Sequence, residues 1–146
     1  MYFEDFPVGY SFVSDRFHVS KDEIVNFAKQ WDPQPFHIDE KMADDYPYGG
    51  LIASGWHTLL ISFRLMLDTG IFQKSSIGSP GMQELRWRLP VRPDDTLVTK
   101  AVVKNSKPSQ SNPDRGFLDV DYAVVNQKDE TVATYSITHM LRVRPK

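Results

Sequence analysis

The 146 residues carry a net charge of -2, with 40% hydrophobic and 25% charged residues. This balance predicts one globular domain, residues 1–146, and argues against a dedicated nucleic-acid binder, which is usually strongly basic. Cysteine is absent, which excludes disulfides, thiolate metal sites and a cysteine nucleophile. Residues 1–5 are acidic and unlike a signal peptide, and no apolar run could cross a bilayer, so we expect a cytoplasmic protein without a membrane partner.

A strand and then a helix are predicted near the start of the chain. Residues 10–19 are rich in Phe, Val and Tyr, which favours a strand. Ser20 and Glu23 match a capping box, in which a hydroxyl and a carboxylate three residues later satisfy free N–H groups at a helix start. The helix is expected to end near Trp31, because Pro33 disfavours the helical conformation of the residue before it.

The next region is expected to be irregular and to lead into an unusually apolar helix. Prolines and a Gly-Gly pair shape residues 33–53, where one short helix is predicted around 39–45. A helix is predicted over residues 55–69, with Ser54 as its cap and Gly70 just beyond its end. Its hydrophobic residues point in nearly every direction around the axis, which predicts that other protein encloses the helix. They are Leu59, Leu60, Ile61, Phe63, Leu65, Met66 and Leu67.

The second half of the chain alternates apolar and polar residues with the period of two that is typical of half-buried strands. The alternation is clear at residues 85–89, 118–124 and 133–143 and weaker at 96–104, whereas residues 106–116 are interpreted as an exposed loop. Strands that follow one another along the chain usually pair antiparallel. The sequence therefore predicts an α+β protein in which one antiparallel sheet covers one enclosed helix.

The densest group of proton-carrying side chains lies between the two predicted helices. Asp32 and His37 lie five residues apart, on a segment that Pro33 and Pro35 are expected to hold extended. Gly55 opens the second helix, where free backbone N–H groups could stabilise the negative charge of an enolate. From the residues alone, two interpretations stay open: an acid–base pair beside an oxyanion site, and ordinary turn chemistry with a structural histidine.

Longer segments around these residues resemble a known family. Asp-Pro-Gln-Pro-Phe-His-Ile-Asp at 32–39 and Tyr-Gly-Gly-Leu-Ile-Ala-Ser-Gly at 48–55 are similar to the hydratase motif of MaoC-like dehydratases and R-specific enoyl-CoA hydratases. Leu-Arg-Trp-Arg-Leu-Pro-Val at 85–91, with Pro-Asp-Asp-Thr at 93–96, resembles the strand and turn of that family. The resemblance implies a hot-dog fold, in which an antiparallel sheet wraps around a long central helix. It also implies a homodimer or higher homo-oligomer.

The resemblance further implies an activity, the reversible addition of water to the double bond of a 2-enoyl thioester of the acyl-CoA type. Asp32 and His37 match the catalytic pair, which holds the attacking water between the two side chains. Asp32 would take a proton from the water and His37 would orient it, while the backbone N–H of Gly55 would polarise the thioester carbonyl. The family requires no metal and no redox cofactor, and coenzyme A enters only as part of the substrate.

The expected substrate-binding residues surround this group, and some depart from the family pattern. They are Gln34, Ser54, Trp56 and His57, although a packing role for His57 is equally consistent with its place in the first helical turn. Gln34 stands where the family commonly has Asn, and Trp56 stands where Met is frequent. R-specific hydratases carry a serine farther along the helix, at a position that aligns with Phe63 here.

Two alternative functions stay open on sequence grounds. The first is an acyl-thioesterase of the same fold; those enzymes generally use a carboxylate without this Asp-to-His motif, and the central helix offers only Asp68. The second is a non-catalytic acyl-CoA-binding hot-dog domain, which the changed residues Gln34 and Phe63 keep under consideration.

The other histidines and the basic residues receive structural interpretations. His139 falls on the apolar face of the last strand, which favours a buried, hydrogen-bonded histidine. His18 has no identifiable partner, and the histidine spacing does not match a metal site. Trp87 is interpreted as a core or interface residue. Basic side chains of the second half could meet coenzyme A phosphates, but their pattern is equally that of a solvated face. They are Arg86, Arg88, Arg92 and Lys104.

Overall fold

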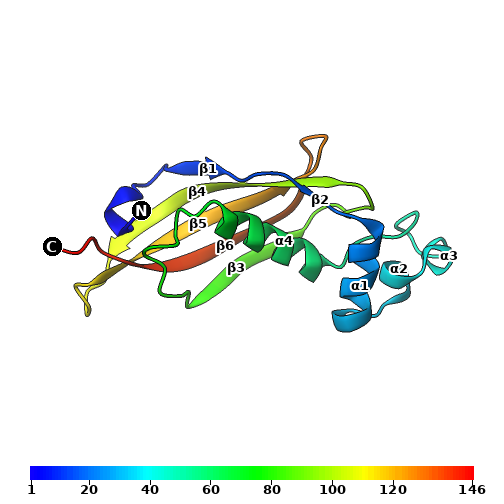
Figure 1. Ribbon diagram of the computed structural model, residues 1–146, viewed down its shortest axis with the longest axis horizontal. Coiled ribbons are helices and arrows are strands. Elements are labelled where there is room, and N and C mark those ends of the chain that lie inside the picture. Colours follow the sequence, from blue (N-terminus) through cyan, green and yellow to red (C-terminus); the bar gives the residue numbers. More distant parts are fainter.

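The fold places one long helix along one face of an antiparallel sheet and gathers three further helices at one end of it (Figure 1). The computed structural model describes residues 1–146. The helices are the short 3-10 turn η1 (Phe3–Asp5), α1 (Lys21–Trp31), α2 (Pro35–Ile38), α3 (Glu40–Ala43) and α4 (Gly55–Asp68). The strands are β1 (Ser11–Val13), β2 (Phe17–His18), β3 (Gly81–Trp87), β4 (Thr96–Pro108), β5 (Arg115–Val125) and β6 (Thr131–Arg142).

The sheet runs in the order β1-β4-β5-β6-β3, with every neighbouring pair antiparallel and β2 paired with β4. In its centre Val120 of β5 lies opposite Val103 of β4 and Ile137 of β6, and all three side chains are buried. Residues in this register share one face of the sheet because side chains alternate along a strand. The predicted antiparallel strands of the second half are therefore confirmed.

The helix α4 packs against that apolar face. Its residues Ile61, Leu65 and Met66 are each at most 5% exposed. Ile61 and Leu65 lie four residues apart, the spacing that places side chains on one side of a helix, and Met66 follows directly beside Leu65. This arrangement confirms the predicted α+β class and the hot-dog fold, with α4 as the central helix.

The opposite side of α4 is not covered within the chain, so the prediction of a fully enclosed helix was wrong at this point. Trp56, Leu60, Phe63 and Leu67 are between 40% and 56% exposed. They recur every three or four residues and form a continuous stripe, which we call the apolar stripe. The sheet lies along one side of α4 only. Because α4 is apolar all round, its other side indicates a second covering surface, which the single chain does not supply.

Two predicted boundaries differ from the structure. The strand predicted over residues 10–19 is divided into β1 and β2, which both pair antiparallel with β4, because the register shifts by one residue between Val13, opposite Lys100, and Phe17, opposite Leu97. The loop predicted over residues 106–116 is shorter, because β4 continues to Pro108 and β5 already begins at Arg115. The end of β4, residues 105–108, is Asn-Ser-Lys-Pro, so its sequence does not alternate apolar and polar residues and gave no strand signal.

The proline-containing segment after α1 also differs from the prediction. It was expected to be extended, but Pro35–Ile38 forms the single turn α2, and a second turn, α3, follows within the predicted short helix. Pro35 occupies the first turn of α2, where the fixed φ of proline suits a helix and its missing N–H costs nothing. The capping box of α1 is confirmed: the Ser20 hydroxyl accepts from the Glu23 N–H, and the Ser20 N–H donates to the Glu23 carboxylate.

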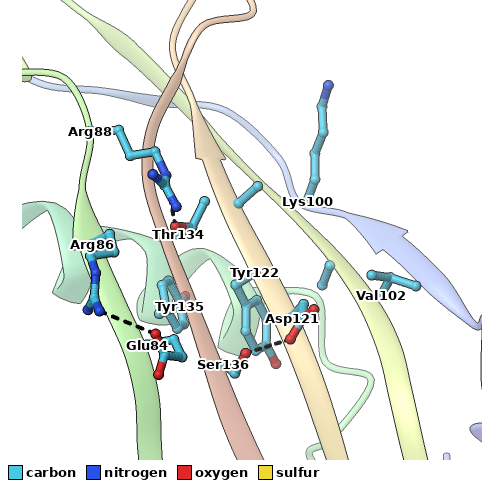
Figure 2. Close-up of a pocket in the computed structure, with 12 residues that line it drawn as sticks. Glu84, Arg86, Arg88, Lys100, Val102, Asp121, Tyr122, Thr134, Tyr135 and Ser136 are labelled. Atoms are coloured by element: carbon cyan, nitrogen blue, oxygen red, sulfur yellow. Dashed lines mark hydrogen bonds and ion pairs between the residues drawn. The ribbon is translucent and has the colours of Figure 1, made fainter.

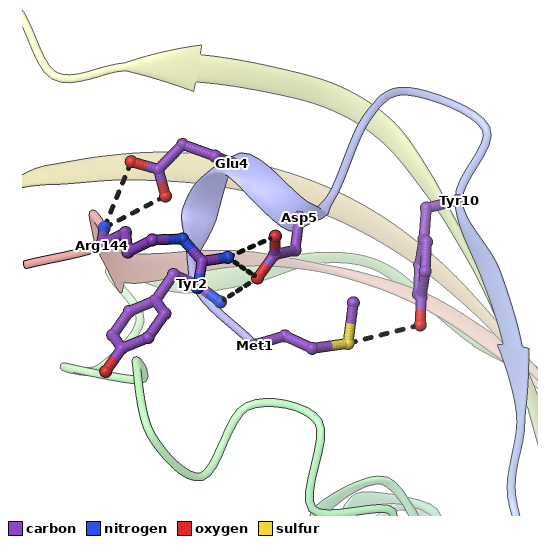
Figure 3. A network of polar contacts seen from close by, with 6 residues as sticks. All are labelled: Met1, Tyr2, Glu4, Asp5, Tyr10 and Arg144. Carbon is purple, nitrogen blue, oxygen red and sulfur yellow. Dashed lines mark hydrogen bonds and ion pairs between the residues drawn. The ribbon is translucent and has the colours of Figure 1, made fainter.

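The two termini are held together at the end of the sheet opposite α1 (Figures 1 and 3). The Arg144 guanidinium lies 2.7 Å from Asp5 Oδ1 and sits over the Tyr2 ring, 5.2 Å from its centroid. The backbone N–H of Arg144 donates to the Glu4 carboxylate. These contacts fix η1 against the last residues of the chain.

None of the helices has the length and apolar character needed to traverse a membrane.

Candidate active site

The candidate site forms where the residue that ends α1 meets the residue that precedes α4. Asp32 follows the last residue of α1, and Ser54 stands at the N-cap of α4. The Ser54 hydroxyl donates to Asp32 Oδ2 at 2.7 Å, across a sequence separation of 22 residues. The predicted capping role of Ser54 is only partly confirmed: the residue holds the N-cap position, but its side chain makes no capping hydrogen bond.

His37 is buried beside Asp32, and its surroundings fix its tautomer. Its Nδ1 lies 2.7 Å from the carbonyl oxygen of Ile52, which can only accept, so Nδ1 carries a proton and donates. Its Nε2 lies 3.3 Å from Asp32 Oδ2. In the neutral ring Nε2 is therefore an acceptor that faces another acceptor. Two arrangements resolve this: Nε2 is protonated and pairs with the carboxylate, or a water donates one hydrogen to each group.

Asp32 is held ionised by its hydrogen bonds. Burial alone would raise the pKa of Asp32, but hydrogen bonds from Ser54 and Gln34 lower it below the ordinary value, and the His37 ring lowers it further whenever it is protonated. The Gln34 side-chain amide donates to Asp32 Oδ1 at 2.7 Å, so each carboxylate oxygen has a donor. The longer amide of Gln34 thus reaches Asp32 despite its departure from the family pattern.

Gly55 lies next to this pair at the wall of a cavity of about 570 Å³. It is the first residue of α4, so its N–H has no acceptor within the helix. The Trp87 ring lies directly on Gly55, where a Cβ would overlap it, and meets Trp56 edge to face at 5.5 Å. The cavity is lined by Asp32, Gln34, Phe36, His37, Tyr48, Ile52, Ala53, Gly55, Trp56, Thr58, Trp87, Arg88, Leu89, Pro90 and Val91.

The segment that follows β3 supplies a wall of the cavity that the sequence did not predict. Trp87 was interpreted as a core or interface residue; the core part of that interpretation is wrong, because Trp87 is 47% exposed and lines the cavity. The N–H of Ala53 donates to the carbonyl of Val91 at 2.8 Å, which ties this segment to the residues just before α4. The family-like stretch at 85–91 was the available signal, but nothing in its spacing indicated that it would lie against Gly55.

Two further residues of α4 have clear environments. His57, predicted to bind substrate or to pack, does not line the cavity; its ring stacks on Phe27 with centroids 4.6 Å apart, and burial lowers its pKa. Phe63 lies on the apolar stripe rather than at the Asp32 cavity. The adjacent Ser62 points into the interior and hydrogen-bonds Thr99.

The remaining histidines occupy structural positions. His139 is 5% exposed, and its Nε2 lies 2.7 Å from the Tyr122 hydroxyl, which confirms the predicted buried, hydrogen-bonded histidine. His18 has a partner that the sequence did not reveal, because its Nε2 lies 3.1 Å from Asp94 at the surface. No three His, Asp or Glu side chains are grouped in a way that could hold a metal ion.

Three of the predicted basic residues lie at or near two cavities, whereas Lys104 is exposed on β4 and lines neither of them. Arg86, Arg88 and Lys100 border a separate, open hollow of about 580 Å³ on the sheet face turned away from α4 (Figure 2). Arg88 donates to Thr134 there and also lines the Asp32 cavity. Arg92 donates to the carbonyl of Tyr48 near the same cavity. The predicted polar face shared by Arg86 and Arg88 is thus a surface of the sheet.

Comparison with known proteins identifies the family. A family model described as "MaoC like domain" matches residues 7–122. Protein YdeM of Bacillus subtilis, described as uncharacterized, is 36% identical over 132 residues, which cover 90% of this chain and 92% of that protein. The 3-hydroxybutyryl-CoA dehydratase of Methylorubrum extorquens is 32% identical over 116 residues, covering 75% of this chain and 68% of the enzyme.

The structural comparison agrees. The crystal structure of the MaoC-like dehydratase from Rhodospirillum rubrum matches with a TM-score of 0.93 and 37% identity, covering 100% of this chain and 99% of that one. The fold and the family model together define a hot-dog protein of the MaoC-like class. This chain belongs to the MaoC-like dehydratase family.

Proposed function

We propose that this protein adds water reversibly to the double bond of a 2-enoyl thioester of the acyl-CoA type. The observation that carries the proposal is the meeting of three groups at one cavity. Asp32 and His37 face each other with 3.3 Å between Oδ2 and Nε2, and Gly55 lies beside them at the start of α4. The described activity of the related 3-hydroxybutyryl-CoA dehydratase supports the same class of substrate.

The chemistry follows from the acceptors that the site presents. An ionised Asp32 Oδ2 and an unprotonated His37 Nε2 can each accept one hydrogen of a single water, because the Ile52 carbonyl holds the other ring nitrogen protonated. The water oxygen attacks the β-carbon and Asp32 takes the proton. The Gly55 N–H stabilises the enolate oxygen of the thioester. The α-carbon then receives a proton from the pair, so that one water is added in total.

The proposal includes a homodimer. The apolar stripe of α4 leaves four large hydrophobic side chains 40% to 56% exposed, and continuous exposed apolar surface of this kind is typical of an interface. A second copy of the chain is the occupant that the family resemblance implies. Analytical ultracentrifugation tests this: a sedimenting mass of twice the chain mass supports it, and a monomer at micromolar concentration contradicts it.

The activity is tested with a panel of short, branched and dicarboxylic 2-enoyl-CoA thioesters. Loss of the absorbance of the conjugated enoyl group after addition of the protein, without release of free thiol, is the expected result. Release of coenzyme A thiol would instead support the thioesterase alternative. Binding of the thioesters without any change in either signal, in the hydration and dehydration directions, would support the non-catalytic alternative.

A further inference from the structure

Ser54 occupies a helix-capping position but uses its hydroxyl elsewhere. A serine at this position usually accepts a hydrogen bond from an N–H of the first helical turn. Here the backbone carbonyl of Ser54 accepts from the Thr58 N–H, while the side chain makes no capping bond and donates instead to Asp32 Oδ2. The residue is completely buried, with 0% exposure. The hydroxyl is therefore directed at the proposed general base.

The choice of carboxylate oxygen is informative. Ser54 contacts Oδ2, which is also the oxygen that faces His37 Nε2 at 3.3 Å. Gln34 contacts the other oxygen, Oδ1, and its hydrogen bond lies in an exposed setting. Two donors on different oxygens prevent rotation of the carboxylate about its bond to Cβ. The buried donor, Ser54, fixes the oxygen that takes part in the proposed chemistry.

We propose that Ser54 is a positioning residue, whose hydroxyl holds Asp32 Oδ2 toward His37 and toward the attacking water. The inference rests on the proposed function and differs from the expected role of Ser54 in substrate binding, because the hydroxyl contacts Asp32 instead. Since the side chain does not cap α4, the N–H groups of the first helical turn also keep their hydrogen-bonding capacity for the substrate oxygen.

Few charged or titratable side chains lie near Asp32, so a change in its pKa can be assigned to a change in a single hydrogen bond. His37 on α2 is the titratable side chain in contact with it, and Arg88 and Tyr48 line the same cavity from the segments after β3 and before α4. The Ser54 hydrogen bond is one of the causes that lower the pKa of Asp32. Its removal leaves the burial of the carboxyl in place and should raise that pKa.

The test compares Ser54→Ala with Ser54→Thr and with Ser62→Ala. Ser62 is the matched control, because it lies on the same helix, is equally buried at 0% exposure and hydrogen-bonds away from the cavity. In Ser54→Ala, carbon-13 NMR titration of the Asp32 carboxyl should show a raised pKa. The kcat should fall by about ten- to a hundredfold, as expected when a reacting group loses its orientation. The KM should change little, and Ser54→Thr should restore both readouts.

The outcomes separate this inference from the proposed function. If Ser54→Ala keeps the parent titration and the parent kcat, or if Ser62→Ala changes the Asp32 titration equally, the positioning role is overturned. If the parent protein hydrates no enoyl thioester, the proposed function fails, while the NMR titration still decides whether Ser54 controls Asp32. A raised pKa in Ser54→Ala alone, with recovery in Ser54→Thr, supports the inference.

Discussion

Two buried serines, one at the N-cap of α4 and one within the helix, engage two very different polar clusters. Ser54, at the start of the helix, bonds the carboxylate of Asp32 beside an open cavity. Ser62, two turns later, bonds the Thr99 hydroxyl at 2.8 Å and the Tyr135 hydroxyl at 2.6 Å in the interior. Both serines are 0% exposed. Burial alone therefore does not distinguish a functional polar group from a structural one.

The difference lies in charge and in free hydrogen-bonding capacity. Around Ser62 the partners are neutral hydroxyls: burial raises the pKa of Tyr135 to about 12, so it stays uncharged near neutral pH. The same interior cluster extends through Tyr122, which stacks on Tyr135, to its hydrogen-bond partner His139, whose pKa burial lowers to about 4, so His139 is uncharged as well. Around Ser54 the central group is an ionised carboxylate whose neighbour, His37, presents a second acceptor to the cavity. A neutral, fully bonded cluster specifies packing, whereas a charged cluster with unused acceptors can move a proton.

The largest effect should come from removing the charge at the cavity. Asp32→Asn keeps the shape of the side chain but cannot accept a proton, so kcat for hydration should fall by about a thousandfold or more. Asp119→Asn is a matched control, because hydrogen bonds from Thr138 and Asn105 also lower the pKa of Asp119, on β5, away from the cavity. It should retain most of the activity in the same absorbance assay. Parent-like turnover by Asp32→Asn would exclude Asp32 as the base.

The interior cluster should instead control how stability depends on pH. Because burial lowers the pKa of His139 to about 4 from 6.5, the folded state disfavours its charged form. Its contribution to stability is complete above pH 6.5 and is lost as the pH falls from 6.5 toward 4. The loss between pH 7 and pH 4.5 should be on the order of 2 kcal/mol, from a shift worth about 1.4 kcal/mol per unit.

Urea unfolding of the parent and of His139→Gln at the two pH values measures this contribution. The buried His57, whose pKa is also lowered, adds acid sensitivity in both proteins and cancels in the difference. The variant should therefore lose less stability than the parent on acidification. An equal loss in both proteins would contradict the prediction, because it would show that the pKa of His139 does not differ between the folded and the unfolded state.

The sequence predicted the interior better than the cavity, for physical reasons. The capping box at Ser20, the antiparallel strands and the buried His139 depend on short-range patterns of period two or on a few adjacent residues. Such patterns report which face of an element is buried. They do not report which buried residues of distant segments touch one another.

The features that the sequence did not predict all depend on long-range contacts. The hydrogen bond between Ser54 and Asp32 spans 22 residues, and the position of Trp87 on Gly55 requires the segment after β3 to reach the start of α4. The helical turn at Pro35 was missed because the two prolines were taken to hold the whole segment extended. Proline disfavours the helical conformation only for the residue before it, so the residues from Pro35 onward remain free to form a turn. The exposed side of α4 was missed because an apolar surface looks alike whether its own chain or a second copy covers it.

A smaller effect is expected when the wall of the cavity is disturbed. In Gly55→Ala the new methyl group would overlap the Trp87 ring, so the ring or the helix start must move. Overpacking of this kind costs about 1–3 kcal/mol of stability, and displacement of the Gly55 N–H should lower kcat by up to about a hundredfold. Gly81→Ala, where a methyl group would meet no atom within 4 Å, serves as the control in both the unfolding and the absorbance assays. Full activity in Gly55→Ala would show that the position of Trp87 is unimportant for turnover.

The smallest effect should follow from removing one hydroxyl of the interior cluster. Tyr135→Phe deletes the partner of one Ser62 hydrogen bond, but the Thr99 hydroxyl remains to bond Ser62, so no buried polar group is orphaned. The free energy of unfolding should fall by about 1 kcal/mol, the net contribution of a typical hydrogen bond. The kcat for hydration should stay at the parent value, because Tyr135 does not line the Asp32 cavity. A clear loss of kcat without loss of stability would mean that the two clusters of α4 are coupled, and the distinction between a structural and a chemical end of the helix would then fail.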